Sequence, residues 1–232
     1  MSKPRKRDSF LKGLISMGPV IPGIIPFGMI MGTVASEAGL SMPQTMGMNV
    51  VVFAGASQLA TIELLTKDAP SIVIILTGLI INLRFLLYSA ASSTYLKESN
   101  LFVKVVGAYS LTDQSYAVSS ANDRFLISRE SKVFFTLGAA LCMTIFWHLF
   151  VLSGFYFGNI IPKSLSLDFA VPLSFMALTI PSLVTRTHLL VGIISISMSI
   201  LLKDLPFNLG LICTAGFCIF IADRLTHEVD NE

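Results

Sequence analysis

Apolar stretches follow one another along the whole chain, separated by short polar segments. Several are long enough, at 1.5 Å per residue, to cross a hydrocarbon core about 30 Å thick. Backbone groups in lipid need internal hydrogen bonds, so such stretches form helices. The pattern predicts an all-α fold, a polytopic transmembrane bundle of seven to eight segments. Seven apolar segments are readable: Gly13–Ser36, Gln44–Leu65, Pro70–Tyr95, Lys132–Ile161, Asp168–Val184, Leu189–Leu202 and Pro206–Ala222.

An eighth stretch, Leu101–Asn122, is richer in Ser, Thr and Gln, and hydropathy alone predicts a loop there. If it crosses, most Lys and Arg residues fall on the side of the N-terminus, and the positive-inside rule then places both termini in the cytoplasm. In this layout Lys67 lies on the N-terminal side, whereas Lys97 and Lys104 lie on the other. An alternative layout keeps Leu101–Asn122 cytoplasmic and makes one of the first three segments re-entrant. The sequence leaves both layouts open.

Composition supports lipid as the solvent of this chain. Of 232 residues, 53% are hydrophobic and only 13% are charged, well below the roughly 25% of ordinary soluble domains. The net charge of +2 and the scatter of basic residues at segment ends argue against nucleic-acid binding. Cys142, Cys213 and Cys218 lie in apolar runs without metal-ligand spacing, so we expect neither a metal nor another cofactor.

One membrane domain accounts for nearly the whole chain. We expect a basic cytoplasmic tail at residues 1–12, a single transmembrane domain at 13–224 and an acidic cytoplasmic tail at 225–232. The first apolar segment contains prolines and is longer than a cleavable signal sequence, so we expect it to be retained. We find no internal repeat in the sequence.

The first segment contains three prolines and three glycines between residues 18 and 28. An uninterrupted helix cannot form there, because proline removes a backbone donor and clashes with the preceding turn. Transporters use such breaks to present backbone groups to ions and substrates, although a packed kink is the alternative. The candidate substrate-binding residues in this segment are Pro22, Gly23, Pro26, Phe27 and Gly28.

Polar side chains inside the second and third segments are further candidates for substrate contact. Ser57 and Gln58 supply hydrogen-bonding groups near mid-segment, either to substrate or to neighbouring helices. Asn82 and Arg84 interrupt an apolar run, and a buried arginine usually faces the bundle interior with a partner unless it snorkels to the interface. Tyr88 follows one turn later on the same face, which makes it a secondary candidate.

Asp113 is the natural opposite charge for Arg84, or a binding group for a substrate ammonium or a proton. If Leu101–Asn122 is a loop, Asp113 is instead a solvated charge. Thr112, which precedes it, and Asp168, a plausible helix cap, are secondary candidates. Ser57 with His148 offers the alternative of an intramembrane serine hydrolase, but no oxyanion-hole pattern accompanies the pair.

Several of these motifs together resemble one known family. They are Gly23-x-x-Pro-Phe-Gly28, Phe53-Ala-Gly-Ala-Ser-Gln58, Asn82-Leu-Arg84, Leu111-Thr-Asp113 and Asp168-Phe-Ala170. In this order they are similar to the AzlC family, the large subunit of branched-chain amino acid exporters. The chain departs from the family pattern in having Phe85 where a histidine is usual and Gln114 where an acid is frequent.

The resemblance implies export of leucine, isoleucine, valine and often methionine across the inner membrane, with a small AzlD-type membrane subunit as partner. We therefore expect a secondary transporter and not an enzyme. An amino acid leaving water needs both of its charges met, while its side chain needs only an apolar pocket. A non-transporting scaffold or channel subunit is the remaining alternative.

Overall fold

The computed structural model describes residues 6–123, 128–158, 185–205 and 209–229, with isolated positions between them. These residues form helices and connecting turns, which confirms the all-α prediction. The predicted segment Asp168–Val184 lies outside the described residues except at isolated positions.

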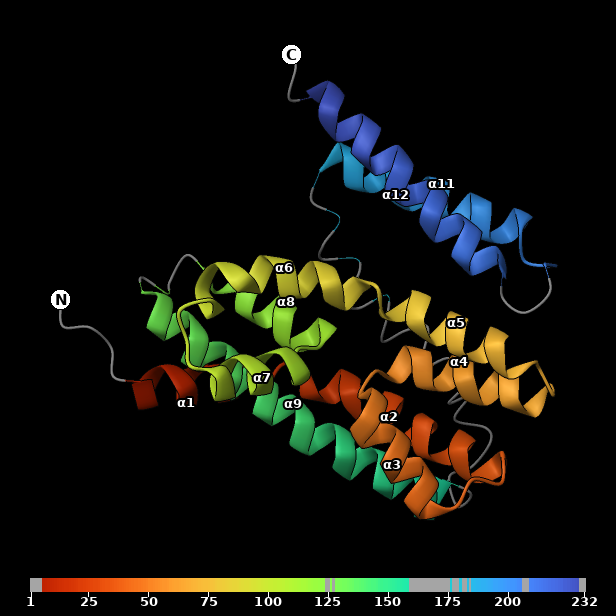
Figure 1. Ribbon diagram of the computed structural model, residues 1–232, viewed down its shortest axis with the longest axis horizontal. Helices are drawn as coiled ribbons and strands as arrows, with labels where there is room; N and C mark the ends of the chain where they lie inside the picture. Colours follow the sequence, from red (N-terminus) through yellow and green to blue (C-terminus); the bar gives the residue numbers. More distant parts are fainter. Residues whose placement is uncertain are drawn as a thin grey trace.

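Helix α9 (Arg129–Phe157) is the central helix of the bundle, and most of the helices that precede it pack on it (Figure 1). It begins at Ser128, whose hydroxyl accepts a hydrogen bond from the Ser131 amide, a standard helix cap. Its 29 residues are apolar enough to cross a bilayer, and at 1.5 Å per residue they exceed the thickness of a hydrocarbon core. Half of the residues in its most apolar stretch are buried.

Helices α1 (Lys6–Ser16) and α2 (Ile21–Glu37) form one bent pair, with an angle of 67° between them. The predicted break in the first segment is thus confirmed, and it lies at residues 17–20. Helix α1 begins inside the stretch expected to be a tail. Pro22 falls in the first turn of α2, where a missing N–H costs little.

Both helices of the α1/α2 pair pack on α9, α1 against its first half and α2 against its second half. Lys6 forms an ion pair of 2.9 Å with Glu130 near the start of α9, and the Thr33 hydroxyl donates to the Gly154 carbonyl near its end. Gly138 and Gly154 permit this close packing, because a Cβ atom at either would lie 2.0 Å from a backbone oxygen of α1 or α2. We call the two ends of the bundle the Lys6 end and the Glu37 end.

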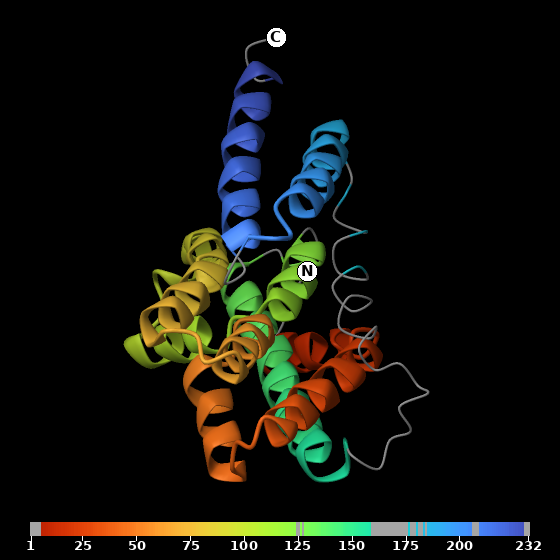
Figure 2. The ribbon, with the colours of Figure 1, turned by 90° about the vertical axis from the view of Figure 1, so that its right-hand side faces the viewer.

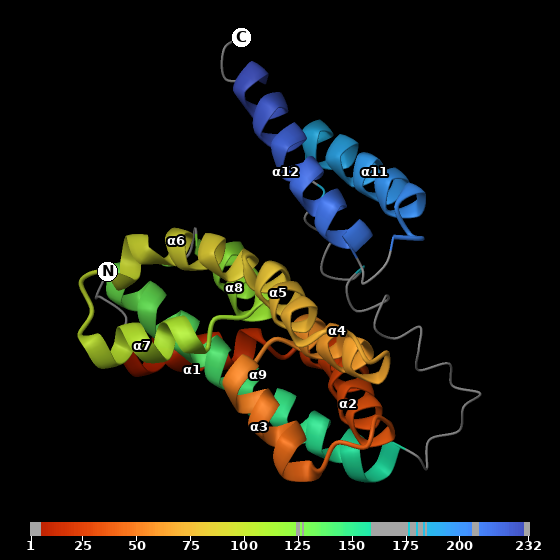
Figure 3. The same ribbon diagram turned by 45° about the vertical axis from the view of Figure 1, so that its right-hand side comes forward.

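Helices α3 (Met42–Val52) and α4 (Gly55–Thr66) form a hairpin that enters from the Glu37 end and returns to it (Figures 1 and 3). A capping box of Ser41 and Gln44 starts α3 just after α2. The turn at Phe53 and Ala54 lies beside Trp147, midway along α9. The predicted segment Gln44–Leu65 is therefore two half-length helices and not one crossing helix.

Helices α5 (Ser71–Asn82) and α6 (Arg84–Leu96) continue each other and form the second run of residues long and apolar enough to cross a membrane. This run is antiparallel to α9: Tyr95 contacts Thr136, and Glu98 pairs with Arg129 at the Lys6 end. The Arg129 guanidinium lowers the pKa of the exposed Glu98 carboxyl. The predicted segment Pro70–Tyr95 matches this run closely.

Helices α7 (Leu101–Tyr109) and α8 (Asp113–Ala121) form a second hairpin, which enters from the Lys6 end and returns there. Asn100 caps α7 next to Arg129, and Asp123 pairs with Lys132 after α8 ends. The stretch that hydropathy predicts as a loop is thus helical, and it turns back at mid-length of α9.

The two hairpins meet tip to tip. The Tyr109 hydroxyl donates a 2.6 Å hydrogen bond to the Val50 carbonyl, and the Tyr109 ring stacks on Phe53 at 5.8 Å. A pair of consecutive helices followed by a hairpin therefore occurs twice among the described residues, first from the Lys6 end and then from the Glu37 end. This order of elements resembles the inverted repeats of many transporters, although no repeat is readable in the sequence.

The hairpins change which lysines lie at which end of the bundle. Because α3/α4 returns to its starting end, Lys67 lies at the Glu37 end, while Lys97 and Lys104 lie near the Lys6 end. The eight-crossing layout predicts the opposite placement of these lysines, and the choice between the two layouts stays a prediction. The described residues contain two spans, or three if the bent α1/α2 pair counts as one, so seven to eight crossings stay a prediction.

Helices α11 (Arg186–Leu201) and α12 (Leu209–Val229) pack on each other and stand apart from the other helices (Figure 2). Helix α12 touches α5, and α11 buries none of its residues. They correspond to the predicted segments Leu189–Leu202 and Pro206–Ala222, displaced by a few residues.

Candidate functional site

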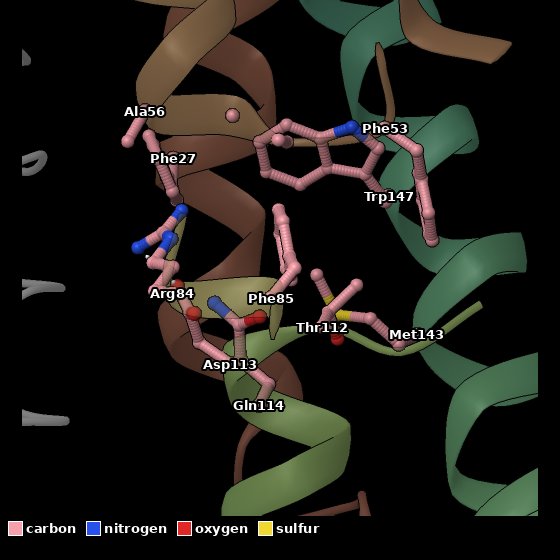
Figure 4. Close-up of a pocket in the computed structure, with 12 residues that line it drawn as sticks. Phe27, Phe53, Ala56, Arg84, Phe85, Thr112, Asp113, Gln114, Met143 and Trp147 are labelled. Carbon is pink, nitrogen blue, oxygen red and sulfur yellow. Dashed lines mark ion pairs between the residues drawn. The ribbon is translucent and has the colours of Figure 1, made fainter. Parts of the chain in front are cut away.

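Three helix breaks meet at one cavity midway along α9 (Figure 4). The breaks are those between α3 and α4, α5 and α6, and α7 and α8. The free space is about 20 Å³, room for about one water molecule. The lining residues are Phe27, Phe53, Ala54, Gly55, Ala56, Arg84, Phe85, Thr112, Asp113, Gln114, Met143 and Trp147.

Arg84 and Asp113 form an ion pair on one wall of this cavity. Arg84 Nη1 lies 2.6 Å from Asp113 Oδ2, and the two side chains are 25% and 18% exposed. Arg84 Nε and Asp113 Oδ1 are buried without a hydrogen-bond partner. An unpaired buried polar atom costs free energy, so this wall has unused capacity to bind a polar ligand.

Helices α4, α6 and α8 all begin at the cavity, at Gly55, Arg84 and Asp113. The N-terminal end of a helix carries partial positive charge and unpaired backbone N–H groups. In α8 a capping box of Thr112 and Ser115 satisfies some of these N–H groups, whereas α4 has no side-chain cap. The cavity therefore favours a negatively charged group near the start of α4.

The remaining wall of the cavity is apolar and aromatic. Phe27 packs edge-on against Trp147 with ring centroids 5.1 Å apart. Phe53 stacks on His148 as well as on Tyr109, and its backbone is left-handed at φ 42°. A bulky residue rarely adopts this conformation, and such strain is typical of functional turns. This wall suits an aliphatic or thioether side chain.

A buried polar network holds the cavity wall from behind. Asn49 Oδ1 accepts hydrogen bonds from Trp147 Nε1 at 2.6 Å and from Gln58 Nε2 at 3.3 Å. Asn49 and Gln58 are fully buried, and Trp147 is nearly so. These bonds join both arms of the first hairpin to α9, so they fix the orientation of the Trp147 ring.

Gly55 lies where the first hairpin comes closest to the aromatic wall. A Cβ atom there would lie 2.5 Å from the Trp147 ring and 2.9 Å from the Phe27 ring. Only glycine allows α4 to start at this position without displacing those rings.

The structure brings four of the predicted site residues together in the cavity: Phe27, Arg84, Thr112 and Asp113. Gln58 lies behind the cavity in the Asn49 network, and the Ser57 hydroxyl donates to the Ala54 carbonyl at 3.0 Å.

The other predicted residues lie around the cavity or away from it. Gly28 packs against Phe150 of α9, and Pro26 lies inside α2. Pro22 and Gly23 are exposed. Asn82 ends α5, with its side-chain oxygen buried and unpaired. Tyr88 stacks on Tyr116 one turn beyond Arg84, and Asp168 lies outside the described residues.

The structure gives no support to a Ser57–His148 pair. The Ser57 hydroxyl is engaged with Ala54, whereas the His148 ring nitrogen Nδ1 bonds the Thr144 carbonyl at 2.7 Å. A nucleophile needs its base within hydrogen-bonding reach, and neither side chain contacts the other among the described hydrogen bonds.

Sequence reasoning missed Asn49, Trp147, Phe53 and Met143 as residues of this site. Asn49 had a signal: it is an uncharged amide inside an apolar segment, where a polar side chain needs a partner. The only sequence signal for Trp147 was its position next to His148. Phe53 had a signal, since it opens the motif Phe53-Ala-Gly-Ala-Ser-Gln58, whereas Met143 is indistinguishable in sequence from other apolar residues of its segment.

Comparison with known proteins supports the family resemblance of the sequence motifs. The family described as AzlC protein matches residues 19–161, a range that contains the whole cavity. An uncharacterized membrane protein of Archaeoglobus fulgidus is 34% identical over 128 residues, which are 54% of this chain and 56% of that protein. The chain thus spans about half the length of this relative. No solved structure matches. Because the family match covers more than half of the sequence and every residue of the cavity, this chain belongs to the AzlC family.

Proposed function

We propose that this protein is a secondary transporter that exports leucine, isoleucine, valine and methionine from the cell by alternating access. It works in the inner membrane with a small AzlD-type membrane subunit. A membrane protein of the AzlC family is consistent with a transporter subunit, and the chemistry of the cavity supports an amino acid as the substrate.

The observation that carries the proposal is the Arg84–Asp113 pair opposite an aromatic wall. A free amino acid carries one positive and one negative charge on adjacent atoms. Its carboxylate suits Arg84 and the uncapped start of α4, and its ammonium suits the unpaired Asp113 oxygen. An aliphatic side chain then lies against Phe27, Phe53 and Trp147.

The size of the cavity supports a moving transporter. An amino acid is far larger than the single water molecule that this space admits, so the helices separate before substrate binds. Two opposed hairpins that meet beside the cavity are suited to this motion, because either one can withdraw toward its own end.

The distribution of charge supports an orientation. Lys6, Arg7, Lys97, Arg129 and Lys132 lie at the Lys6 end, while Lys67 lies at the other end among Glu37, Glu63 and Asp68. Positive residues gather on the cytoplasmic side of membrane proteins. We place the Lys6 end, and with it the N-terminus, in the cytoplasm.

The test is efflux of labelled leucine and methionine from liposomes that contain the purified protein, with and without the small subunit. We expect efflux from the wild type and none from Arg84→Ala or Asp113→Asn. Lys67→Ala is the matched control, because it breaks an exposed ion pair far from the cavity. Efflux retained in both cavity variants, with unchanged folding, would indicate a scaffold or channel subunit instead.

A cellular measurement complements the liposome assay. Cells fed with leucine-containing dipeptides generate leucine inside, where the exporter is needed. Deleting the genes of this chain and its small partner should raise intracellular leucine. Unchanged leucine in the deletion strain contradicts export.

A further inference from the structure

A second cavity lies between the central cavity and the Lys6 end. Its free space is about 120 Å³, room for several water molecules. Ala91, Thr94 and Tyr95 of α6 line one side, and Tyr116, Ser119 and Ser120 of α8 line another. Asp123, Leu126, Lys132 and Thr136 complete the wall, and none of these residues lines the central cavity.

Helices α6 and α8 both line the central cavity at their starts and the second cavity further along. Both helices run from mid-bundle to the Lys6 end, and two side-chain contacts join them about one turn apart. The first contact is the Arg84–Asp113 pair, and the second is the stack of Tyr88 on Tyr116, with centroids 4.6 Å apart and rings inclined by 18°. The tyrosine pair thus stands between the central cavity and the second one.

The lining of the second cavity is suited to a polar guest. Hydroxyl groups are costly in an apolar protein interior unless they find partners. Ser119 is only 6% exposed, yet its hydroxyl has no hydrogen-bond partner, and its residue lines this cavity. At the outer edge Lys132 and Asp123 present opposite charges 2.6 Å apart, the two groups that an amino acid zwitterion requires.

We propose that this second cavity is an access site where a free amino acid binds from the Lys6 side, and that Tyr88 and Tyr116 form the barrier to the central cavity. The carboxylate binds Lys132, the ammonium binds Asp123, and Ser119 supplies a further hydrogen bond. The role of the cavity as a substrate site rests on the proposed transport function. The tyrosine barrier does not rest on that function, because it is inferred from the positions of the side chains alone.

The barrier is tested by cysteine labelling with a membrane-impermeant thiol reagent added at the Lys6 side. The background lacks Cys142, Cys213 and Cys218. We expect fast labelling of Ser120→Cys in the second cavity and slow labelling of Thr112→Cys in the central cavity. Adding Tyr88→Ala and Tyr116→Ala should speed Thr112→Cys labelling about two- to tenfold, the range that loss of one aromatic contact allows.

Tyr88→Phe with Tyr116→Phe is the matched control, because it keeps the ring stack and removes only the hydroxyls. Labelling of Thr112→Cys should stay slow in this variant. Equal labelling rates of Ser120→Cys and Thr112→Cys in the protein with intact tyrosines overturn the barrier, as does an unchanged Thr112→Cys rate after both alanine substitutions. These readouts need no transport, so they stand even if the proposed substrate is wrong.

The access site is tested by transport kinetics measured separately from each side. Ser119→Ala and Lys132→Gln should raise KM for leucine several-fold from the Lys6 side and leave KM from the Glu37 side unchanged. A purely structural role of Ser119 predicts no change, since removing an unpaired hydroxyl does not weaken folding. If the wild type is active and both variants keep its KM, the access site is excluded. The proposed function is unaffected by that result.

Discussion

The Arg84 guanidinium lies 2.6 Å from the Asp113 carboxylate where helices α6 and α8 begin. Arg84 follows the apolar helix α5, and Asp113 follows the turn between α7 and α8. Their pairing joins the second span to the second hairpin beside the cavity. A change in this pair therefore affects both folding and substrate binding, and the two effects need separate measurements.

Removing one member of this pair should destabilise the protein as well as abolish transport. Arg84→Ala leaves Asp113 as an unpaired, largely buried charge, which costs about 3 kcal/mol in comparable pairs. Thermal unfolding in detergent measures this loss. The exchanged variant, Arg84→Asp with Asp113→Arg, should recover part of the stability without transport, because the charges then face substrate in the wrong order. Transport by the exchanged variant contradicts direct substrate binding by the pair.

Asn49 should be coupled energetically to Trp147. Asn49→Ala leaves the indole N–H and the Gln58 amide without their shared acceptor, at about 1–3 kcal/mol for each buried group left unpaired. Trp147→Phe already lacks the indole N–H, so Asn49→Ala should cost less in that background. A double-mutant cycle of unfolding free energies measures this coupling energy. We expect at least about 0.5 kcal/mol, the lower limit of the roughly 0.5–3 kcal/mol found for residues in contact. Additive costs argue against the coupling.

Gly55→Ala should impair transport more than any other alanine substitution of a glycine in the first hairpin. The added methyl group meets the Trp147 and Phe27 rings at less than 3.0 Å, so one ring moves into the cavity. Gly47→Ala in α3 is the matched control, because its Cβ meets nothing within 4 Å, and alanine stabilises a helix by about 0.5–1 kcal/mol over glycine. Equal transport by the two variants shows that the cavity tolerates ring displacement.

The fit of α1 against α9 should depend on Gly138. A Cβ atom there lies 2.0 Å from the Phe10 carbonyl oxygen, and a backbone cannot yield as a flexible side chain can. We expect Gly138→Ala to lower the unfolding temperature markedly. Gly216→Ala in α12 has open space around it and should change little. Comparable unfolding temperatures would show that α1 packs on α9 less closely.

The two hairpins make a topological prediction. Single cysteines at Glu37 and Asp68 should be labelled from one side of the membrane, and those at Glu98 and Asp123 from the other. The eight-crossing layout instead predicts opposite sides for Glu37 and Asp68. Labelling of intact cells and inverted vesicles with an impermeant reagent distinguishes the two arrangements.

Much of the site was predictable from local chemistry. Three prolines near the start of the chain forced a break, and it lies at residues 17–20. Arg84 and Asp113 are charges inside apolar surroundings, and their pairing was one of the roles expected for Asp113. Pro22, Gly23 and Gly28 had the composition of a binding motif, yet they do not line the cavity, because the chain already breaks before Pro22 and Gly28 serves helix packing.

The sequence by itself determined that helices in lipid build this protein and which polar residues need partners inside it, because hydropathy and desolvation act on each residue locally. Only the tertiary structure decided that Gln44–Leu65 and Leu101–Asn122 turn back at mid-length, that Asn49 orients Trp147, and that Tyr88 meets Tyr116. These features depend on contacts between segments far apart in the chain. Whether a half-length helix continues or returns is decided by the neighbours that bury its ends.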